Sequence, residues 1–265
     1  LANSAMPVEM GDRIGTQDMC GPAYAPALGI SQDDTDSLIS AIKASGKDEI
    51  NVTFNADSKV THKVKSPNVW GEIPDKTDEV IYMMAHLDGY FHSYFDDASG
   101  CGLILGTAKA MLDSEYKPNK TIRFICHGSE EWGYENSQAD WAIGSFQQLT
   151  KVHPEWQGTT LGILNYELPA KKGTQGGLKG TFRTTEENYE IQNEFLKESG
   201  LTEILGATAD MAQKNGSQPM SDAICYQYKG VPCYEINAQY GTEGNELSTY
   251  HTKYDDKEEY SAEAM

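Results

Sequence analysis

The segment from residue 84 to residue 100, MAHLDGYFHSYFDDASG, places several ionisable side chains directly after an apolar run. Asp88 follows His86 by two residues and Asp96 follows it by ten. In an open α/β sheet, ligands bind outside the carboxyl ends of the strands, so the residues that follow apolar runs are candidates for chemistry. Imidazole and carboxylate groups at such positions indicate metal binding or acid-base catalysis.

Three further apolar runs are followed by groups of the same kind. Glu130 and Glu131 occur in CHGSEEWG, Glu167 ends the run LGILNYE, and His251 stands in TYHTKYDD. Nitrogen and carboxylate ligands without thiolates suit zinc or a similar divalent ion in an open, catalytic arrangement. The sequence therefore predicts a metal-dependent hydrolytic site at one edge of one sheet.

A site for two metal ions needs one shared carboxylate, and one histidine with one further carboxylate for each ion. Five of the candidates meet that requirement, and one glutamate remains. We predict that Asp96 bridges the ions, that His86 and Glu167 bind one of them, and that Glu131 and His251 bind the other.

Glu130 is left over from the ligand set, and a carboxylate that binds no metal commonly serves as general base in zinc hydrolases. We predict that Glu130 takes a proton from a water that bridges the metals and passes it to the leaving amine. Asp88 is predicted to orient the imidazole of His86 through its second ring nitrogen. His92, His127 and His153 are predicted not to be ligands.

Strands that read as continuous apolar runs alternate with amphipathic helices from residue 66 onward, which predicts a three-layer α/β/α domain with a mixed, mostly parallel sheet. Asp97 and Ser99 are expected to cap the first helix of this domain, and Gly100 to permit close packing there. The expected strands cover 80–85, 121–126, 160–166 and 231–236, and the expected helices cover 98–112, 136–150, 185–199 and 222–228.

Residues 1–65 lack the alternation of apolar strands and amphipathic helices that begins at residue 66. This difference predicts a separate, partial unit. A helix capped by Asp33 or Asp34 and ended by Gly46 precedes an alternating stretch at 50–54 that predicts a strand. This unit is too small to bury its own faces. The catalytic domain is predicted over 66–265, with a final helix that begins at EEYSAEAM and is cut short.

Composition excludes some partners. The formal net charge is −19 and no cluster of Lys and Arg could follow a phosphate backbone, so nucleic acid is not an expected partner. No stretch is apolar enough for a membrane helix, and no signal peptide is recognisable, although a trimmed start would hide one. The five cysteines form an odd number, which favours a reducing, cytoplasmic compartment over secretion; a Cys225–Cys233 disulfide is the alternative.

Five motifs in order, AHLDG, DDASG, SEEWG, SDAICYQYKGVP and YHTKYDD, resemble those of the co-catalytic zinc exopeptidases, which include bacterial leucyl aminopeptidases and glutamate carboxypeptidases. The resemblance covers roughly residues 68 to 260 and implies the zinc-exopeptidase fold with two zinc ions per site. It selects Asp96 over Asp97 as the bridging ligand and implies a cis peptide bond after it. The N-terminal unit resembles the last part of a protease-associated domain.

Two departures from the family pattern concern the site. Glu167 stands where the aminopeptidases usually have aspartate, and Tyr94 and Phe95 replace small residues before the bridging aspartate. The rings of the GYFHSYF segment either pack the loop or form a wall of the substrate pocket. Tyr250 is a candidate to donate a hydrogen bond to the developing oxyanion.

The expected function is a zinc-dependent exopeptidase, an aminopeptidase, acting on a peptide or an aminoacyl small molecule. A carboxypeptidase needs a cation for the terminal carboxylate, and Arg183 is the single arginine in the second half of the chain. Three alternatives remain: a carboxypeptidase, a single-zinc amidase related to glutaminyl cyclases, and a non-catalytic homologue used for binding. The sequence leaves the oligomeric state open.

Overall fold

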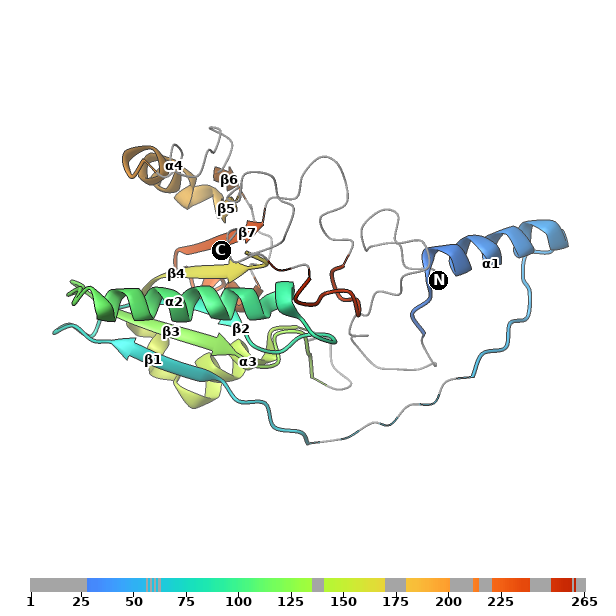
Figure 1. Ribbon diagram of the computed structural model, residues 1–265, viewed down its shortest axis with the longest axis horizontal. Helices are drawn as coiled ribbons and strands as arrows, with labels where there is room; N and C mark the ends of the chain where they lie inside the picture. The colour runs from blue at the N-terminus through green and yellow to red at the C-terminus, as the bar shows by residue number, and fades with distance from the viewer. Residues whose placement is uncertain are drawn as a thin grey trace.

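The computed structural model describes residues 28–55, 57, 59, 61, 63–134, 141–169, 180–200, 212–214, 221–238, 249–258 and 260. At its centre lies a seven-stranded sheet with the strand order β1-β3-β2-β4-β7-β5-β6 (Figure 1). The strands are β1 Val69–Ile73, β2 Val80–His86, β3 Thr121–His127, β4 Thr160–Glu167, β5 Gly180–Thr184, β6 Ala212–Lys214 and β7 Cys233–Ala238.

The four central strands β3, β2, β4 and β7 are parallel to one another. β1 is antiparallel to β3 at one side, and at the other side β5 is antiparallel to β7 while β6 is parallel to β5. The predicted mixed, mostly parallel sheet is therefore confirmed. Because the central strands run the same way, their carboxyl ends meet at one edge, where His86 pairs with His127 and Glu167 pairs with Asn237.

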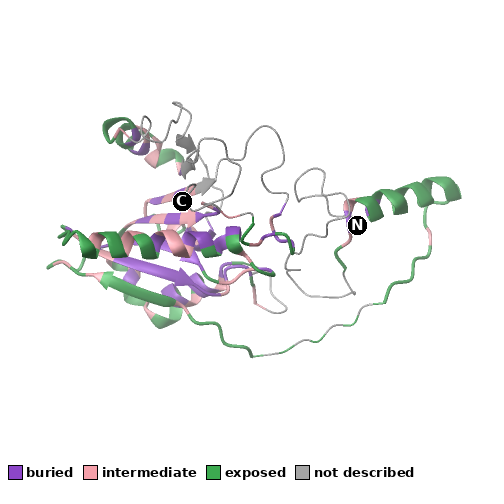
Figure 2. Cartoon of the chain, viewed as in Figure 1, coloured by how far each residue is buried: buried purple, intermediate pink, exposed green. Residues whose placement is uncertain are grey.

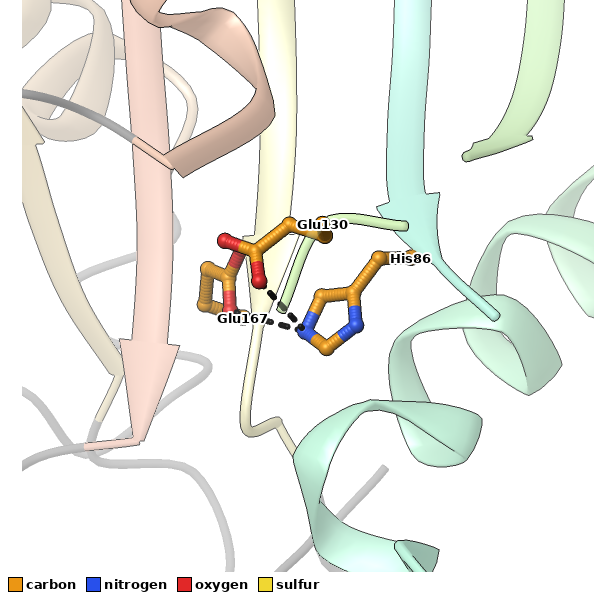
Figure 3. A group of neighbouring side chains, drawn as sticks. All are labelled: His86, Glu130 and Glu167. Atoms are coloured by element: carbon orange, nitrogen blue, oxygen red, sulfur yellow. Dashed lines mark ion pairs between the residues drawn. The ribbon is translucent and has the colours of Figure 1, made fainter. Parts of the chain in front are cut away.

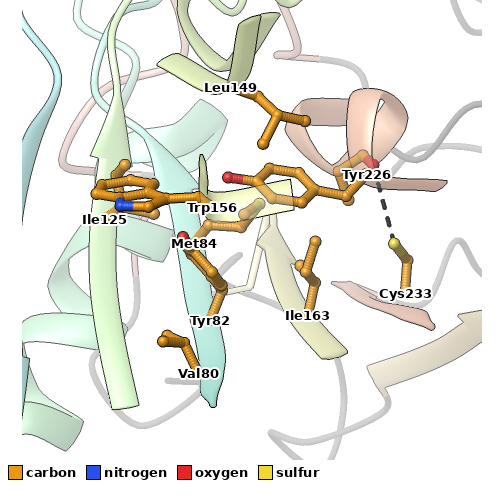
Figure 4. Packing of buried hydrophobic residues seen from close by; sticks show 10 residues of the cluster. Val80, Tyr82, Met84, Ile125, Leu149, Trp156, Ile163, Tyr226 and Cys233 are labelled. Carbon is orange, nitrogen blue, oxygen red and sulfur yellow. Dashed lines mark hydrogen bonds between the residues drawn. The ribbon is translucent and has the colours of Figure 1, made fainter. Parts of the chain in front are cut away.

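Helices cover both faces of the central strands, which explains why these strands read as continuous apolar runs (Figures 1 and 2). On one face, α2 (Ser99–Asp113) packs against Met83, Ala85 and Phe124. On the other face, Tyr82 and Met84 belong to a cluster with side chains from the helical segments that follow β3 and precede β7 (Figure 4). Those segments are the turns at Gln148–Val152, Pro154–Gly158 and Ser221–Ala223, and α6 Ile224–Gln227. Helix α3, Ile143–Gln147, directly precedes the first of them.

Two predictions for the N-terminal unit are wrong in detail. Helix α1 spans Gln32–Ser45 and is capped by Ser31, whose hydroxyl accepts the N–H of Asp34, and not by Asp33 or Asp34 themselves. Gly46, with a φ of 63°, ends the helix as expected. Residues 50–55 form no strand, because the described part of the chain offers them no neighbouring strand to pair with.

The remaining helices differ from the expected ones mainly at their ends. The helix expected at 136–150 is described as α3, followed by a turn of π-helix that ends at Val152, and residues 135–140 lie outside the description. The helix expected at 185–199 is α4, Tyr189–Glu198, preceded by a 3₁₀ turn at Glu186–Asn188. The final helix falls outside the described residues, and the domain boundary at residue 65 stays a prediction. None of the described helices combines the length and apolar character needed to cross a bilayer.

Candidate metal centre

The five predicted ligand side chains converge at the carboxyl edge of the sheet. β2 ends at His86 and β4 ends at Glu167, while the loop after β3 supplies Glu131. Asp96 lies in a π-helical turn, Tyr94–Ala98, directly before α2, and His251 lies in a turn after β7. All five residues are buried, and none is more than 9% exposed.

Asp96 lies between the two histidines. Its Oδ1 is 3.1 Å from Nε2 of His86, and its Oδ2 is 3.0 Å from Nε2 of His251. The peptide bond between Asp96 and Asp97 is cis, as the resemblance implied. Each oxygen of one carboxylate thus faces a different imidazole, which is the placement expected of a group shared by two ions.

Each histidine has a second carboxylate as neighbour. Nε2 of His86 lies 3.7 Å from Oε2 of Glu167, and Nε2 of His251 lies 3.0 Å from Oε1 of Glu131. The structure therefore brings the five side chains together with Asp96 between the two pairs, and their assignment to two ions stays a prediction.

Glu130 lies on the same side of the site as Glu167. Its Oε2 is 4.0 Å from Nε2 of His86, and Figure 3 shows both glutamates directed at this one imidazole nitrogen. His86, Glu130 and Glu167 are close enough to hold a cation together, as are His86, Asp96 and Glu131. The distances alone thus leave Glu130 within reach of either a ligand or a base role.

Within the described part of the chain, two carboxylate oxygens of the site lack hydrogen bonds that a bound cation would replace. Oδ2 of Asp96 and Oε1 of Glu131 are buried and make no hydrogen bond among the described residues, although each is 3.0 Å from the same nitrogen of His251. Buried oxygen atoms are normally hydrogen-bonded, and a cation would satisfy both. Carboxylate and imidazole donors are the set that zinc binds in catalytic sites.

The crowding of carboxylates changes the protonation of the metal-free site. Burial alone would lower the pKa of His86, but the carboxylates of Glu130, Asp96 and Glu167 raise it well above its usual value. Burial raises the pKa of Glu131 to about 7. Without a cation the site holds protons in its place, so metal binding would release them.

Asp88 acts on the site differently from the prediction. The backbone carbonyl of Asp88 lies 2.9 Å from Nδ1 of His86, whereas Oδ1 of its carboxylate lies 3.8 Å from this nitrogen, beyond hydrogen-bond distance. A carbonyl only accepts, so it assigns the proton to Nδ1 and leaves Nε2 free to face the site. The carboxylate instead accepts the main-chain N–H groups of Glu130 at 3.0 Å and Glu131 at 3.2 Å, because it lies beneath the loop after β3.

Asp97 holds three segments together behind the site. Its carboxylate accepts the N–H groups of His86, Gly100 and Leu168 at 3.1 to 3.3 Å. The bond to Gly100 confirms the predicted cap at the start of α2, and a Cβ at Gly100 would collide with this carboxylate. Ser99 is not a cap, because it lies inside the helix and donates to the carbonyl of Phe95.

The rings of the GYFHSYF segment confirm the packing alternative for Tyr90 and Phe95, and the pocket-wall alternative stays a prediction. Phe95 is buried, and the ring of Tyr90 lies 4.6 Å from the ring of His251. Phe91 and Tyr94 are exposed. The segment is therefore partly packing beneath the site and partly surface.

Tyr250 stacks on the imidazole of His251, with ring centroids 3.7 Å apart. Burial, followed by the nearby charges of Asp96 and Glu131, raises the pKa of Tyr250 well above its usual value. Its hydroxyl therefore keeps its proton and can act as a donor.

The three histidines that are not expected to bind metal belong to neither of the groups of described side chains that could hold a cation. His92 is exposed, and His153 contacts Glu155 and stacks on Trp156. His127 is fully buried beside His86, and burial lowers its pKa to about 3, which keeps it neutral. Cys225 and Cys233 are both free thiols, so the alternative disulfide is not formed.

Two residues at the site were not predicted from sequence. The hydroxyl of Ser221 donates to Oε1 of Glu130 at 2.7 Å and also contacts Oε1 of Glu167. Asp255 binds the backbone of the segment that carries Asp96. Both lie inside motifs that the sequence displays, SDAICYQYKGVP and TYHTKYDD, which was the available signal.

Comparison with known proteins places this geometry in a family. The model of peptidase family M28 matches residues 68–265. No curated protein sequence matches the chain significantly.

Solved structures share the fold at low sequence identity. BSAP, a zinc aminopeptidase from Bacillus subtilis, has a TM-score of 0.61 at 17% identity, with 88% of this chain and 52% of that chain covered. An aminopeptidase from Aneurinibacillus sp. strain AM-1 has a TM-score of 0.56 at 21% identity, covering 88% and 52%. A glutaminyl cyclase from Bacteroides thetaiotaomicron has a TM-score of 0.57 at 17% identity, covering 74% and 72%. The chain thus spans about half the length of these aminopeptidases.

Proposed function

The chain belongs to peptidase family M28, and we propose that it is a two-zinc aminopeptidase, which hydrolyses the first peptide bond of a substrate with a free α-amine. The observation that carries the proposal is the placement of Asp96, whose two carboxylate oxygens lie 3.1 and 3.0 Å from two different imidazoles. With Glu167 and Glu131, each of two ions would be held by one histidine, one glutamate and the shared Asp96. Bound zinc would supply a Lewis acid that polarises the scissile carbonyl and acidifies water.

Glu130 is the proposed general base. Burial raises its pKa well above the usual value, and the charge of Glu167 adds to this effect, although His86 opposes it. A carboxylate with a raised pKa both accepts a proton from the attacking water and returns it to the leaving amine. Ser221 donates to one oxygen of Glu130 at 2.7 Å, which leaves the other oxygen to receive that proton.

Tyr250 and Asp88 have supporting roles in this proposal. The hydroxyl of Tyr250 stays protonated beside the carboxylates, and a neutral donor there would stabilise the oxyanion that forms on the carbonyl. Asp88 fixes the main chain at Glu130 and Glu131, so it sets the position of the base relative to one ligand. Tyr250 would thus stabilise the transition state directly, and Asp88 would hold the base and one ligand in the positions that the transition state needs.

The described side chains favour a free amine over a free carboxylate as the recognised terminus. Asp96, Glu130, Glu131 and Glu167 are all buried at this edge of the sheet. Among the side chains that the structure describes, the single arginine is Arg123, which binds Glu72 and lies 3.7 Å from the ring of Trp156 in the core. With two Zn²⁺ bound, these four negative charges would be balanced, so the preference rests on the cation that a terminal carboxylate needs, and no arginine among the described side chains is placed to supply it.

The proposal is tested with matched substrates and controlled zinc content. Protein stripped with a chelator is assayed on amino-acid p-nitroanilides with free and with N-acetylated amines, before and after zinc is restored. We expect activity on the free-amine substrates, and only with zinc. Equal turnover of the acetylated substrates would contradict recognition of the amine, and zinc-independent turnover would contradict the metal mechanism.

A glutaminyl cyclase is the second candidate, because the solved structures that share this fold include glutaminyl cyclases as well as aminopeptidases. The two activities differ in the released product. A peptide with N-terminal glutamine would lose ammonia and keep its length in the cyclase reaction, whereas an aminopeptidase would release free glutamine. Mass spectrometry of such a peptide after incubation distinguishes them.

A further inference from the structure

Asp255 is a buried carboxylate that faces the main chain of the segment carrying Asp96. It is 1% exposed. Its Oδ1 accepts the N–H of Phe95 at 2.7 Å, and its Oδ2 accepts the N–H of Asp96 at 3.1 Å. Both oxygens are therefore used on two consecutive amides, one of which belongs to the proposed bridging residue.

The segment that carries Asp255 also carries His251. The N–H of Thr252 donates to the carbonyl of Thr249 at 3.0 Å, and the N–H of Asp255 donates to the carbonyl of Thr252 at 3.1 Å. Thr252 is fully buried, and its hydroxyl donates to the carbonyl of Thr249 as well. These successive turns fix the distance between His251 and Asp255 along a short, buried stretch.

Asp96 is thus held twice by one segment. Its side chain lies 3.0 Å from the imidazole of His251, and its backbone N–H binds Asp255. Its own turn supports it less than a regular helix would, because Asp96 has non-helical backbone angles, φ −118° and ψ 89°. Amides at the start of a helical segment have no partner within it and depend on such an external acceptor.

We infer that Asp255 is a positioning residue for the metal centre, which sets the bridging carboxylate of Asp96 against His251 and so governs the affinity for the metal ions. It does so through the main chain, with no contact to substrate. The charge of the carboxylate strengthens both hydrogen bonds relative to a neutral acceptor. The inference rests on the proposed function in one respect, that Asp96 and His251 bind metal.

The neighbouring Asp256 provides a matched control. Its Oδ1 accepts the N–H of Glu258 in an exposed turn. D255N and D256N make the same chemical change at adjacent positions, and only the first alters a hydrogen bond to the segment of Asp96. Asparagine keeps the shape of aspartate but offers one acceptor oxygen instead of two, so D255N leaves one buried amide without its partner.

The experiment measures zinc affinity of the full 265-residue chain by competition with a chromophoric chelator. Groups that orient metal ligands typically change metal affinity by about 10- to 100-fold when they are replaced. We expect D255N to bind zinc more weakly by that factor, D256N to match the parent protein, and the cobalt-substituted D255N protein to show an altered visible spectrum. If Asp255 served only the stability of the fold, D255N would unfold at a lower temperature with unchanged zinc affinity, and that result would overturn the inference.

A second variant covers the case in which D255N does not fold. D255E keeps both acceptor oxygens but moves them by one methylene, so we expect a smaller loss of zinc affinity in the same direction. Unchanged affinity in D255E would then overturn the inference. Failure of the parent protein to bind zinc is a separate result, because it would contradict the proposed function before any variant is compared.

Discussion

The carboxylate of Asp88 accepts the main-chain N–H of Glu130 at 3.0 Å, so the residue that follows β2 fixes the residue that is proposed as the base. Its second oxygen accepts the N–H of Glu131. The carbonyl of the same residue faces Nδ1 of His86. One residue therefore sets the direction of two proposed ligands and the base.

Replacement of Asp88 by Asn should weaken catalysis more than it weakens the fold. The amide keeps one acceptor oxygen and loses the other, so one of the two N–H groups is left without a partner. We expect kcat/KM to fall by about 10- to 100-fold, as is typical for groups that orient metal ligands. Asp78→Asn, at an exposed position, is the control and should leave kcat/KM unchanged. An Asp88→Asn protein with full activity would contradict this positioning role.

Glu130→Gln and Glu131→Gln should separate the base from a ligand. The two residues are adjacent and both buried, so the variants are matched in chemistry and surroundings. We expect Glu130→Gln to keep its zinc and lose turnover by about 10²- to 10⁴-fold, the usual contribution of a positioned base. Glu131→Gln should instead lose zinc. Metal analysis beside turnover checks both, and loss of zinc from the Glu130 variant would assign that residue to the ligands.

Ser221→Ala should move the pH profile of the reaction. The hydroxyl donates to Glu130, and a hydrogen bond to the ionised form of a carboxyl group lowers its pKa. Without this donor the pKa of Glu130 should rise, so the base is ionised only at higher pH. We expect the rising limb of kcat/KM against pH to shift upward by roughly half a unit to one unit. An unshifted limb would indicate that Ser221 does not act on the base.

The central part of the fold could be predicted from the sequence because its signals are local. The apolar runs that became β2 and β3 are buried on both faces along most of their length, so their pattern does not depend on which neighbour they pair with. β5 and β6 gave no such signal: β6 is three residues long, and β5, GTFRT, contains a single large apolar residue. The alternation at 50–54 suggested a strand, but a strand exists only where a partner is present.

In the site, too, the features with local sequence signals could be predicted and those that depend on distant contacts could not. His86 and Glu167 are found at strand ends, and Glu131 lies shortly after one, so topology alone brings them to one edge. The actual atoms that Asp88 uses could not be predicted, because they depend on how the loop after β3 folds over it. The contact between Ser221 and Glu130 spans 91 positions in the sequence, and no local pattern reports such a contact.

Tyr250→Phe tests the proposed donor to the oxyanion. The substitution removes one oxygen and keeps the ring that stacks on His251. A donor that acts only on the developing charge contributes to kcat and little to KM. We expect kcat to fall by about 10²-fold with zinc content unchanged. A rise in KM at constant kcat would assign Tyr250 to substrate binding instead.

Metal-free protein should become less stable as the pH rises from about 6.5 to about 9, since below 6.5 the neutral His127, whose pKa burial lowers to about 3, contributes an opposite dependence. Burial raises the pKa of Glu131 to about 7, from an ordinary value of 4.5. Burial alone would lower the pKa of His251, but the carboxylates of Asp96 and Glu131 raise it to about 9, from 6.5. Between the ordinary and the raised value, the folded protein binds a proton that the unfolded chain has released, so a higher pH favours unfolding.

Zinc should reverse this dependence of stability on pH. Zinc and protons compete for the same side chains, and fewer protons are bound at higher pH, so zinc binds more tightly and stabilises the fold more. Urea unfolding at several pH values, with chelator and with excess zinc, measures both effects. We expect the free energy of unfolding of the metal-free protein to fall by on the order of a few kcal/mol across this range, and the gain from zinc to increase. If the metal-free protein were equally stable throughout, the raised pKa values of Glu131 and His251 would be wrong. If the gain from zinc were independent of pH, the cation would bind elsewhere than among these protonated groups.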